Sequence, residues 1–171
     1  MKYKLGLKPL TTDRRDLKLS SFYKTTPVLP SNFGATGLPW GMLGNDIRGN
    51  CYFASGAHET MAEAFQADRN PPFDTEEVLT SYAQYLGLGS AADLNERNDE
   101  GTDAREGAKF RRKYGIKDAK GVAHKIGAYA FIEQADYQLI KSAVHDFEGI
   151  TVCVELPYSA EERFESGVWD Y

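Results

Sequence analysis

The sequence has few of the residues on which many sites depend, with two cysteines and three histidines in 171 residues. No pair of His, Cys or carboxylate side chains shows the spacing of a zinc site, so we expect no metal and no other cofactor. No apolar run approaches the ~18 residues of a membrane span, and the first residues, MKYKLGLKPLTTDRRDL, lack the apolar centre of a signal peptide. These absences favour synthesis in the cytoplasm and no membrane partner.

An excess of positive charge is also lacking. The 20 basic and 25 acidic side chains give a net charge of −5, which argues against nucleic acid as the main partner. The glycines before position 51 are not followed by Lys-Ser or Lys-Thr, so a phosphate-binding loop is excluded. Basic residues near position 110 stand at helical spacing beside Glu106, which is typical of a solvated helix face. They are Lys109, Arg111, Arg112 and Lys113.

What the chain does have is material for a packed core. Hydrophobic residues make up 42% of the sequence and aromatic residues 12%, so the chain is expected to fold and not to be disordered. Its length suffices for one domain with a real core, or for two small lobes around a cleft.

Cys51 lies where a polar, glycine-rich loop runs into a helical pattern, in GNDIRGNCYFASGAHETMAEAF. From there apolar residues recur three or four apart, which predicts a helix of about four turns with one apolar stripe. The sulfur would sit at the first turn, where unpaired backbone N–H groups and the helix dipole favour a thiolate. A small buried hydrophobe at the same place is the alternative. The stripe consists of Ala54, Ala57, Met61, Ala64 and Phe65.

The letters around Cys51 add a resemblance. The stretch LPSNFGATGLPWGMLGNDIRGNCYFAS resembles the start of the papain-like cysteine peptidases, where a polar loop leads to a Gly-x-Cys-aromatic step and a long central helix. It is most similar to the divergent branch of bacteria and bacteriophages, with Tyr52 where plant and lysosomal members carry Trp. The resemblance implies an α+β fold, with a helical left lobe around the Cys-bearing helix and a right-hand β lobe that is partial here.

The same resemblance assigns roles to residues. It implies that Cys51 is the nucleophile and that Asn45, six residues earlier, donates to the oxyanion where the family more often has Gln. Gly101 matches the glycine whose backbone pairs with the substrate peptide, although a plain turn glycine would give the same pattern. The residues assigned to substrate binding are Gly49, Asn50, Tyr52 and Gly101.

Caps and turn residues predict two further helices in the first part of the chain. One follows Asp74, with Glu77 three residues later as a capping partner, and one spans roughly Asp103 to Tyr114 and stops at Gly115. The apolar face of the former is expected to comprise Val78, Leu79, Tyr82 and Leu86.

The second part of the chain is expected to supply the β lobe. Residues 124–132, HKIGAYAFI, alternate as a strand does, and residues 135–148 have helical spacing. The β-branched run ITVCVEL at 150–156 has the pattern of a buried strand, which places Cys153 in the core. Residues 1–28 are expected to form an N-terminal arm along the surface or a short leader, and residues 29–171 the papain-like domain.

A catalytic histidine is the missing part. In the papain type it follows the nucleophile by about 130–150 residues, which gives roughly positions 181–201, whereas this sequence ends at Tyr171. His58, His124 and His145 are not expected near Cys51; His58, for example, is about 10 Å along the same helix. We therefore expect the papain-like domain to be incomplete on its C-terminal side.

Two functions follow from these expectations. The first is a thiol hydrolase, phage- or prophage-encoded, that cleaves peptide bonds of a protein or of cell-wall peptide. The alternative is a papain-like domain without activity that serves as a structural part of a virion or binds a second chain.

Overall fold

The computed structural model describes residues 6–23, 28–31, 37–67, 69–132, 136–147 and 149–154. Within these ranges the chain combines helices with one small antiparallel sheet, which is an α+β structure in general terms. The elements are η1 (Leu19–Ser21), α1 (Cys51–Gln66), α2 (Thr75–Tyr85), η2 (Ala91–Asp93), α3 (Ala104–Lys113), β1 (Ile116–Lys117), β2 (Ala123–His124) and α4 (Tyr137–Phe147).

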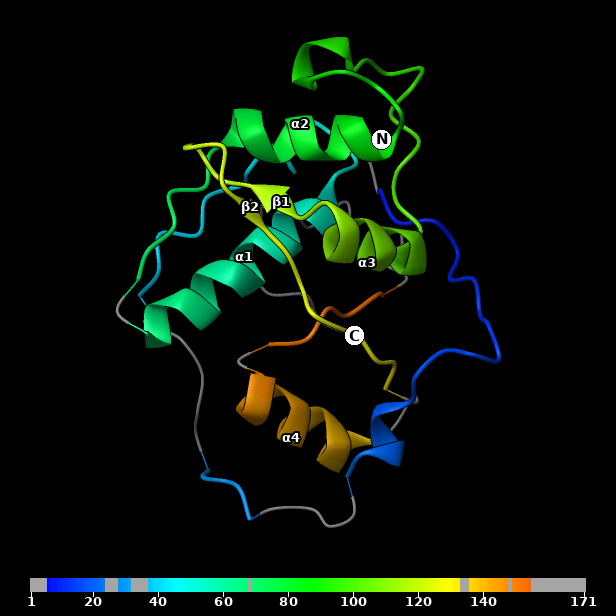
Figure 1. The fold of residues 1–171 in the computed structure, drawn as a ribbon, viewed down its shortest axis with the longest axis vertical. Helices are drawn as coiled ribbons and strands as arrows, with labels where there is room; N and C mark the ends of the chain where they lie inside the picture. The colour runs from blue at the N-terminus through cyan, green and yellow to red at the C-terminus, as the bar shows by residue number, and fades with distance from the viewer. Residues whose placement is uncertain are drawn as a thin grey trace, which may run out of the picture.

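Helix α1 begins at Cys51, as the sequence predicts, and its first half is covered on several sides. Phe53 and Ala57 are fully buried, and four residues of the predicted stripe are buried: Ala54, Ala57, Met61 and Ala64. The prediction is wrong for Phe65, which is 47% exposed. The last turn of α1 extends beyond the helices that cover its start, as Figure 1 shows.

Helices α2 and α3 begin at the caps that the sequence indicates. The Asp74 carboxylate accepts a hydrogen bond from the Glu77 backbone N–H at 2.9 Å, and Asp103 does the same for Glu106 at 3.0 Å. Gly115 follows α3 with φ +81°, a left-handed conformation that glycine adopts without strain, and ends the helix. Both predicted helices are therefore confirmed.

The only sheet among the described residues is the hairpin of β1 and β2, in which Ile116 lies opposite His124 and Lys117 opposite Ala123. The predicted strand at 124–132 is wrong beyond its first residue. Between β2 and residue 132, where every residue is described, only Phe131 forms an isolated bridge, with Lys18. Alternation describes two faces, but a strand also needs a neighbouring strand to pair with, and none lies alongside among the described residues.

The predicted strand at 150–156 is also wrong in its described part, residues 150–154, which has no strand conformation. Val152 and Val154 are 64% and 61% exposed, and Cys153 is exposed as well. The assignment of Cys153 to the core is therefore wrong. Residues 155 and 156 lie outside the described residues.

The main core lies among α1, α2, α3 and β1, which we call the helical unit (Figure 1). Phe53 is at its centre, with the rings of Tyr82, Tyr85 and Phe110 at centroid distances of 5.5 to 5.6 Å in tilted or edge-on contact. The other buried members are Leu43, Tyr52, Ala54, Ala57, Val78, Leu79, Ala83, Leu94 and Ile116.

A second, smaller apolar cluster lies against α4 and consists of Leu19, Leu139 and Ala143. We call this part the α4 region. Figure 1 shows the short helix η1, in blue, beside α4 at the end of the molecule away from α2. The N-terminal arm thus runs from the helical unit to the α4 region and contributes to the packing of both.

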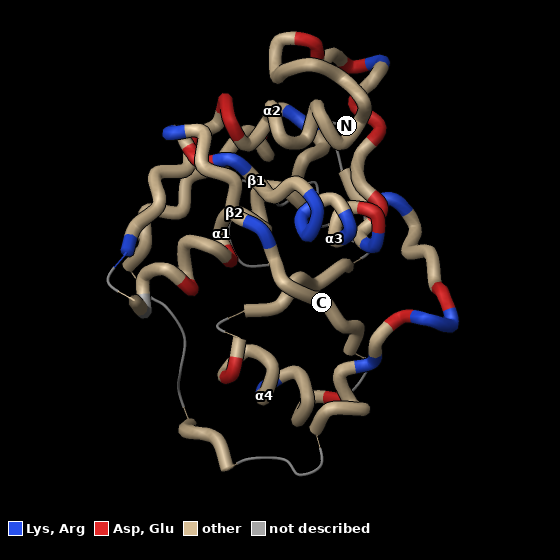
Figure 2. The backbone as a smooth tube through the Cα atoms, viewed as in Figure 1, with Lys and Arg blue, Asp and Glu red and all other residues tan. Residues whose placement is uncertain are grey.

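The basic residues of α3 do not all face solvent. Arg111 is only 4% exposed, and its Nη1 lies 2.6 Å from Oε2 of Glu59 on α1. The interpretation as a solvated face is therefore wrong at Arg111, whereas Arg112 and Lys113 are exposed. Figure 2 shows acidic and basic positions interspersed over the described backbone. No helix among the described residues has the length and hydropathy needed to span a membrane.

Candidate functional site

The candidate site is the start of α1. Asn50 is the residue before the helix, and its carbonyl accepts hydrogen bonds from the N–H groups of Phe53 at 2.8 Å and Ala54 at 3.0 Å. These bonds hold the first turn, so the Cys51 side chain emerges at the helix terminus. Its thiol is free and half-buried.

The electrostatic surroundings of Cys51 favour the neutral thiol. Burial raises the pKa of Cys51 above its ordinary value, and the charge of Asp99 acts in the same direction. The backbone N–H groups of Tyr52, Gly6 and Cys51 itself act in the opposite direction and lower the pKa of the thiol, but they do not compensate. The thiolate expected from the helix terminus alone is therefore not favoured, because that expectation left out the loss of water around the sulfur.

A buried carboxylate organises the backbone beside Cys51. Asp99 is 3% exposed and accepts hydrogen bonds from the N–H of Gly49 at 3.0 Å and from the hydroxyl of Tyr82 at 2.6 Å. The same hydroxyl accepts from the N–H of Gly101 at 2.8 Å. Burial raises the pKa of Tyr82, and its bond to Asp99 adds to that effect, so the phenol stays protonated as the donor. This network fixes Gly49 and Gly101 relative to each other.

The N-terminal arm lies against these two glycines. The carbonyl of Gly6 accepts from the N–H of Thr102 at 2.6 Å, and the N–H of Lys8 donates to the carbonyl of Thr102 at 2.9 Å, which makes a parallel bridge. Gly101 has φ +76°, and a Cβ there would lie 2.2 Å from the Gly6 carbonyl oxygen. A Cβ on Gly6 would lie 1.8 Å from the carbonyl oxygen of Gly49.

Three residues assigned to the site on sequence grounds therefore lie together. Gly49 and Gly101 are joined through Asp99 and Tyr82, Gly6 packs against both glycines, and Cys51 follows Gly49 by two residues. The arrangement can hold an extended backbone beside Gly49 and Gly101 by main-chain contacts.

The two asparagines differ in their surroundings. Asn45 is half-buried in the turn before α1, its N–H donates to Met42 at 2.9 Å, and its side-chain amide makes no hydrogen bond to the described residues. Asn50 is fully buried, and its Nδ2 donates to the Leu43 carbonyl at 2.9 Å. Asn50 therefore supports the loop from inside, and its side chain offers no surface to a substrate.

Tyr52 belongs to the core and not to an open binding surface. It is 5% exposed, and its ring fills the space that a Cβ on Gly107 of α3 would occupy. Burial raises the pKa of Tyr52 to about 12, although the Arg111 guanidinium, 6.0 Å from the ring centroid, acts against the rise. A substrate contact through the Tyr52 side chain is not available in this arrangement.

Each of the three histidines bonds to a group away from Cys51. His58 Nε2 lies 2.8 Å from the carbonyl of Trp40, and His124 Nε2 lies 3.0 Å from a carboxylate oxygen of Asp118. His145 Nδ1 lies 2.8 Å from the carboxylate of Asp146 on α4. None of these bonds directs an imidazole toward the sulfur.

The segment that carries Cys153 is attached to α1 at Glu59. Partial burial raises the pKa of Cys153, and the charges of Cys51 and Asp103 act in the same direction. Glu59 of α1 secures the segment, because one carboxylate oxygen bonds to Arg111 of α3 and the other accepts from the hydroxyl of Thr151.

Sequence reasoning missed Gly6, Asp99 and Tyr82 as parts of this site. Asp99 lies in the acidic, amide-rich loop before Gly101. Its position two residues before that glycine could have indicated that it belongs to the site. Tyr82 was assigned to a helix face, which is correct, but its hydroxyl carries the additional role. Gly6 had no local signal, because its importance depends on which glycines it meets.

No group of three or more His, Cys, Asp or Glu side chains among the described residues is arranged to hold a metal ion. Comparison with models of protein families, with curated proteins and with solved structures gives no match to this chain.

Proposed function

We propose that the chain is a papain-like thiol hydrolase domain in which Cys51 attacks a peptide bond of an extended peptide. The observation that carries the proposal is the placement of residues 6–8, whose backbone is paired with Thr102 and packs through Gly6 against Gly49, two residues before Cys51. A substrate in the same place would be held by its backbone at Gly101 and Thr102, beside the nucleophile. Side-chain identity would then matter less than an extended conformation.

The proposed reaction proceeds in two steps. The Cys51 sulfur attacks the carbonyl carbon, the C–N bond breaks, the leaving amine takes up a proton, and the acyl group remains on sulfur as a thioester. Water then releases the acid and restores the thiol. Asn45, whose half-buried amide has no partner among the described residues, is the proposed donor to the oxyanion. The imidazole that moves the proton comes, in this proposal, from outside the 171 residues.

The test uses a peptide that carries an electrophile, because covalent capture needs the thiol and the peptide site but not the external imidazole. A peptidyl epoxide should modify Cys51 at a rate that saturates with its concentration, and the same epoxide without the peptide should not. Cys153→Ser is the matched control and should be modified as the wild type is. Equal modification of Cys153, or no saturation, would contradict the proposal.

Turnover provides a second reading of the same proposal. Fluorogenic peptides and cell-wall peptides should be cleaved slowly, since general acid–base help is worth about 10² to 10⁴-fold. Added imidazole should raise the rate in the wild-type chain and in Cys153→Ser but not in Cys51→Ser. A rise in all three proteins would locate the reaction elsewhere. The rates with the two kinds of peptide also show whether protein or cell wall is the better substrate. The phage or prophage origin is a proposal that rests on the resemblance alone.

A second candidate function is a papain-like peptide-binding module without catalysis, such as a virion component or a binder of a second chain. It is favoured by the bonds that engage all three imidazoles elsewhere and by the raised pKa of Cys51. In that case Cys51→Ser should bind extended peptides as tightly as the wild type, and imidazole should produce no turnover in either protein.

A further inference from the structure

A local excess of positive charge lies in the segment that runs from α3 through β2. The chain as a whole has a net charge of −5, yet residues 109–125 contain a single acid, Asp118. This carboxylate is 3% exposed and bonds to His124, so it does not offset the basic side chains at the surface. The basic residues of the segment are Lys109, Arg111, Arg112, Lys113, Lys117, Lys120 and Lys125.

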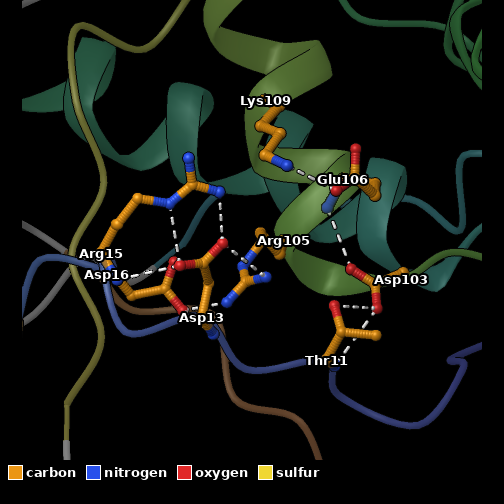
Figure 3. Close-up of polar contacts among 8 residues, drawn as sticks. All are labelled: Thr11, Asp13, Arg15, Asp16, Asp103, Arg105, Glu106 and Lys109. Carbon is orange, nitrogen blue, oxygen red and sulfur yellow. Dashed lines mark hydrogen bonds and ion pairs between the residues drawn. The ribbon is translucent and has the colours of Figure 1, made fainter.

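Some cations of α3 are already paired within the fold. Figure 3 shows Arg105 bonded to Asp16 of the N-terminal arm and Lys109 bonded to Glu106, the latter pair at 2.6 Å. Arg111 is buried and paired with an acid of α1. These three side chains are therefore neutralised by the protein itself.

Four other cations have no such partner. Arg112 and Lys113, in the last turn of α3, are exposed. Lys117 of β1 lies on the side of its strand away from Ile116, which is 1% exposed and faces the core. Lys125 directly follows β2 and is exposed. Among the described residues no acidic side chain pairs with any of these four.

The four cations adjoin because the end of α3 meets the hairpin. A Cβ on Gly115 would lie 2.7 Å from the carbonyl oxygen of His124, so the last turn of α3 lies against β2. Figure 2 shows basic positions, in blue, around the labels of α3, β1 and β2. Lys120 is set apart, because the turn that carries it bonds to the Pro72 carbonyl, beside the acidic first turn of α2. We call the four cations the basic face: Arg112, Lys113, Lys117 and Lys125.

Local structure explains single members of the basic face but not their grouping. Cations in the last turn of a helix stabilise it through the helix dipole, which accounts for Arg112 and Lys113. Lysines on a short sheet discourage pairing with other strands, which accounts for Lys117 and Lys125. Neither reason requires the two pairs to adjoin, and like charges that adjoin repel each other until a partner of opposite charge binds.

We propose that the basic face binds nucleic acid through its backbone phosphates, without reading the bases. Each phosphate that a cation neutralises releases condensed counterions, a gain in affinity that an acidic peptide of the same charge does not offer. Arg112 can hold two phosphate oxygens with its guanidinium, and the three lysines act as point charges. The binding is local, so it does not make nucleic acid the main partner of a chain with a net charge of −5. It is also independent of the proposed function, because it involves neither Cys51 nor turnover.

The experiment measures binding of the full chain to a fluorescein-labelled DNA duplex of about 20 base pairs by fluorescence anisotropy, between about 50 and 200 mM salt. The logarithm of the binding constant should fall linearly with the logarithm of the salt concentration. Four neutralised phosphates predict a slope of about −3.6. Arg112→Ala with Lys113→Ala should weaken binding at least about tenfold at low salt and halve the slope, and Lys117→Ala with Lys125→Ala should do the same.

Two further variants keep the result interpretable. Arg69→Ala with Lys141→Ala is the matched control, since both side chains are exposed, lie outside the basic face and change the net charge equally. It should bind as the wild type does. Arg112→Lys with Lys113→Arg keeps both charges and should retain the slope, which separates a loss of charge from a disturbance of α3.

Several outcomes overturn the proposal. One is the absence of binding at low salt, and another is an equal loss in the matched control, which would mean that only the net charge matters. Equal affinity for a poly-glutamate peptide, or for vesicles that contain phosphatidylserine, would assign the basic face to an acidic protein or a membrane surface in place of nucleic acid. A preference among duplexes of different sequence would show that bases are read.

Discussion

The helical unit and the α4 region are made from similar helices but are packed very differently. In the helical unit Phe53 and Tyr82 are fully buried, and elements from four parts of the chain close around them. In the α4 region the core has three members, while Tyr137 and Phe147 at the two ends of α4 are 71% and 60% exposed. Caps and spacing suffice to form a helix in both places, but only the helical unit has enough neighbours to bury it. The stability of the fold, and with it the position of Cys51, therefore depends on the helical unit.

The largest effect expected from this difference comes from removing a core ring. Phe53→Ala should lower the free energy of unfolding by about 3–5 kcal/mol, because the surrounding rings cannot collapse into the cavity. Leu139→Ala in the α4 region should cost about 2 kcal/mol at most, since its neighbours are few and partly exposed. Urea unfolding of both variants measures this. Equal losses would mean that the two regions share one cooperative core.

A smaller effect is expected from the network behind Cys51. Tyr82→Phe should cost about 1–3 kcal/mol, because the N–H of Gly101 and the carboxylate of Asp99 each lose a buried partner. Tyr85→Phe is the matched control, since that hydroxyl lies farther from its own partner, 3.3 Å from the N–H of Asp103. Thermal unfolding of the two variants measures the difference. A larger loss in Tyr82→Phe than in Tyr85→Phe would show that the hydroxyl of Tyr82 holds the site, whereas equal losses would mean that its ring only fills space.

Acid should weaken the helical unit through Asp118. Burial alone would raise the pKa of Asp118, but hydrogen bonds from His124 and from the N–H groups of Val122 and Lys120 outweigh it and hold the pKa below its ordinary value. Because the folded pKa lies below the unfolded one, this stabilisation is present above pH ~4 and is lost as the pH falls through the folded value.

The Asp118→Asn variant should therefore lose stability at neutral pH and show a shallower decline below pH ~4 than the wild type. Urea unfolding between pH 7 and pH 3 would measure both effects. Asp46→Asn, a change at an exposed aspartate, should follow the wild-type curve. A decline in Asp118→Asn as steep as in the wild type would assign the acid sensitivity to other carboxylates.

The smallest effect is expected at the far end of α1. Phe65→Ala should cost less than about 1 kcal/mol because its ring is 47% exposed, whereas Met61→Ala, one turn earlier and 5% exposed, should cost about 2–5 kcal/mol. Circular dichroism melts of the two variants would show where along α1 the helical unit ends. A large loss in Phe65→Ala would extend the core to the end of the helix.

The helices could be predicted because their signals are local. Asp74 and Asp103 cap helices that follow them directly, and Gly115 ends α3 by its own backbone conformation. The start of α1 at Cys51 is likewise set by the change from a glycine-rich loop to helical spacing. In the candidate site, Gly49 and Gly101 were assigned to substrate binding on the strength of the resemblance; both contact Gly6, and their part in binding stays a prediction.

The remaining features depend on neighbours that the local sequence does not specify. Residues 125–132 and 150–154 have the composition of strands but no partner strand along their length in the part of the chain that the structure describes. They stay irregular, and Cys153 is left exposed. Burial of Arg111 depends on Glu59, which lies 52 residues away. The pKa of Cys51 was misjudged for the same reason, because burial and Asp99 are contributed by segments distant in the chain.

The carboxylate of Glu59 has a consequence for how this protein can change during evolution. It serves Arg111 and Thr151 at once, so the helix that carries Cys51, helix α3 and the segment that carries Cys153 meet at one side chain. Loss of the acid would leave a buried guanidinium without its counter-charge, which is costly, whereas joint replacement by apolar residues would not. Among homologous sequences, positions 59 and 111 should therefore be exchanged together, with position 151 following them, and an isolated change at one of the pair should be rare.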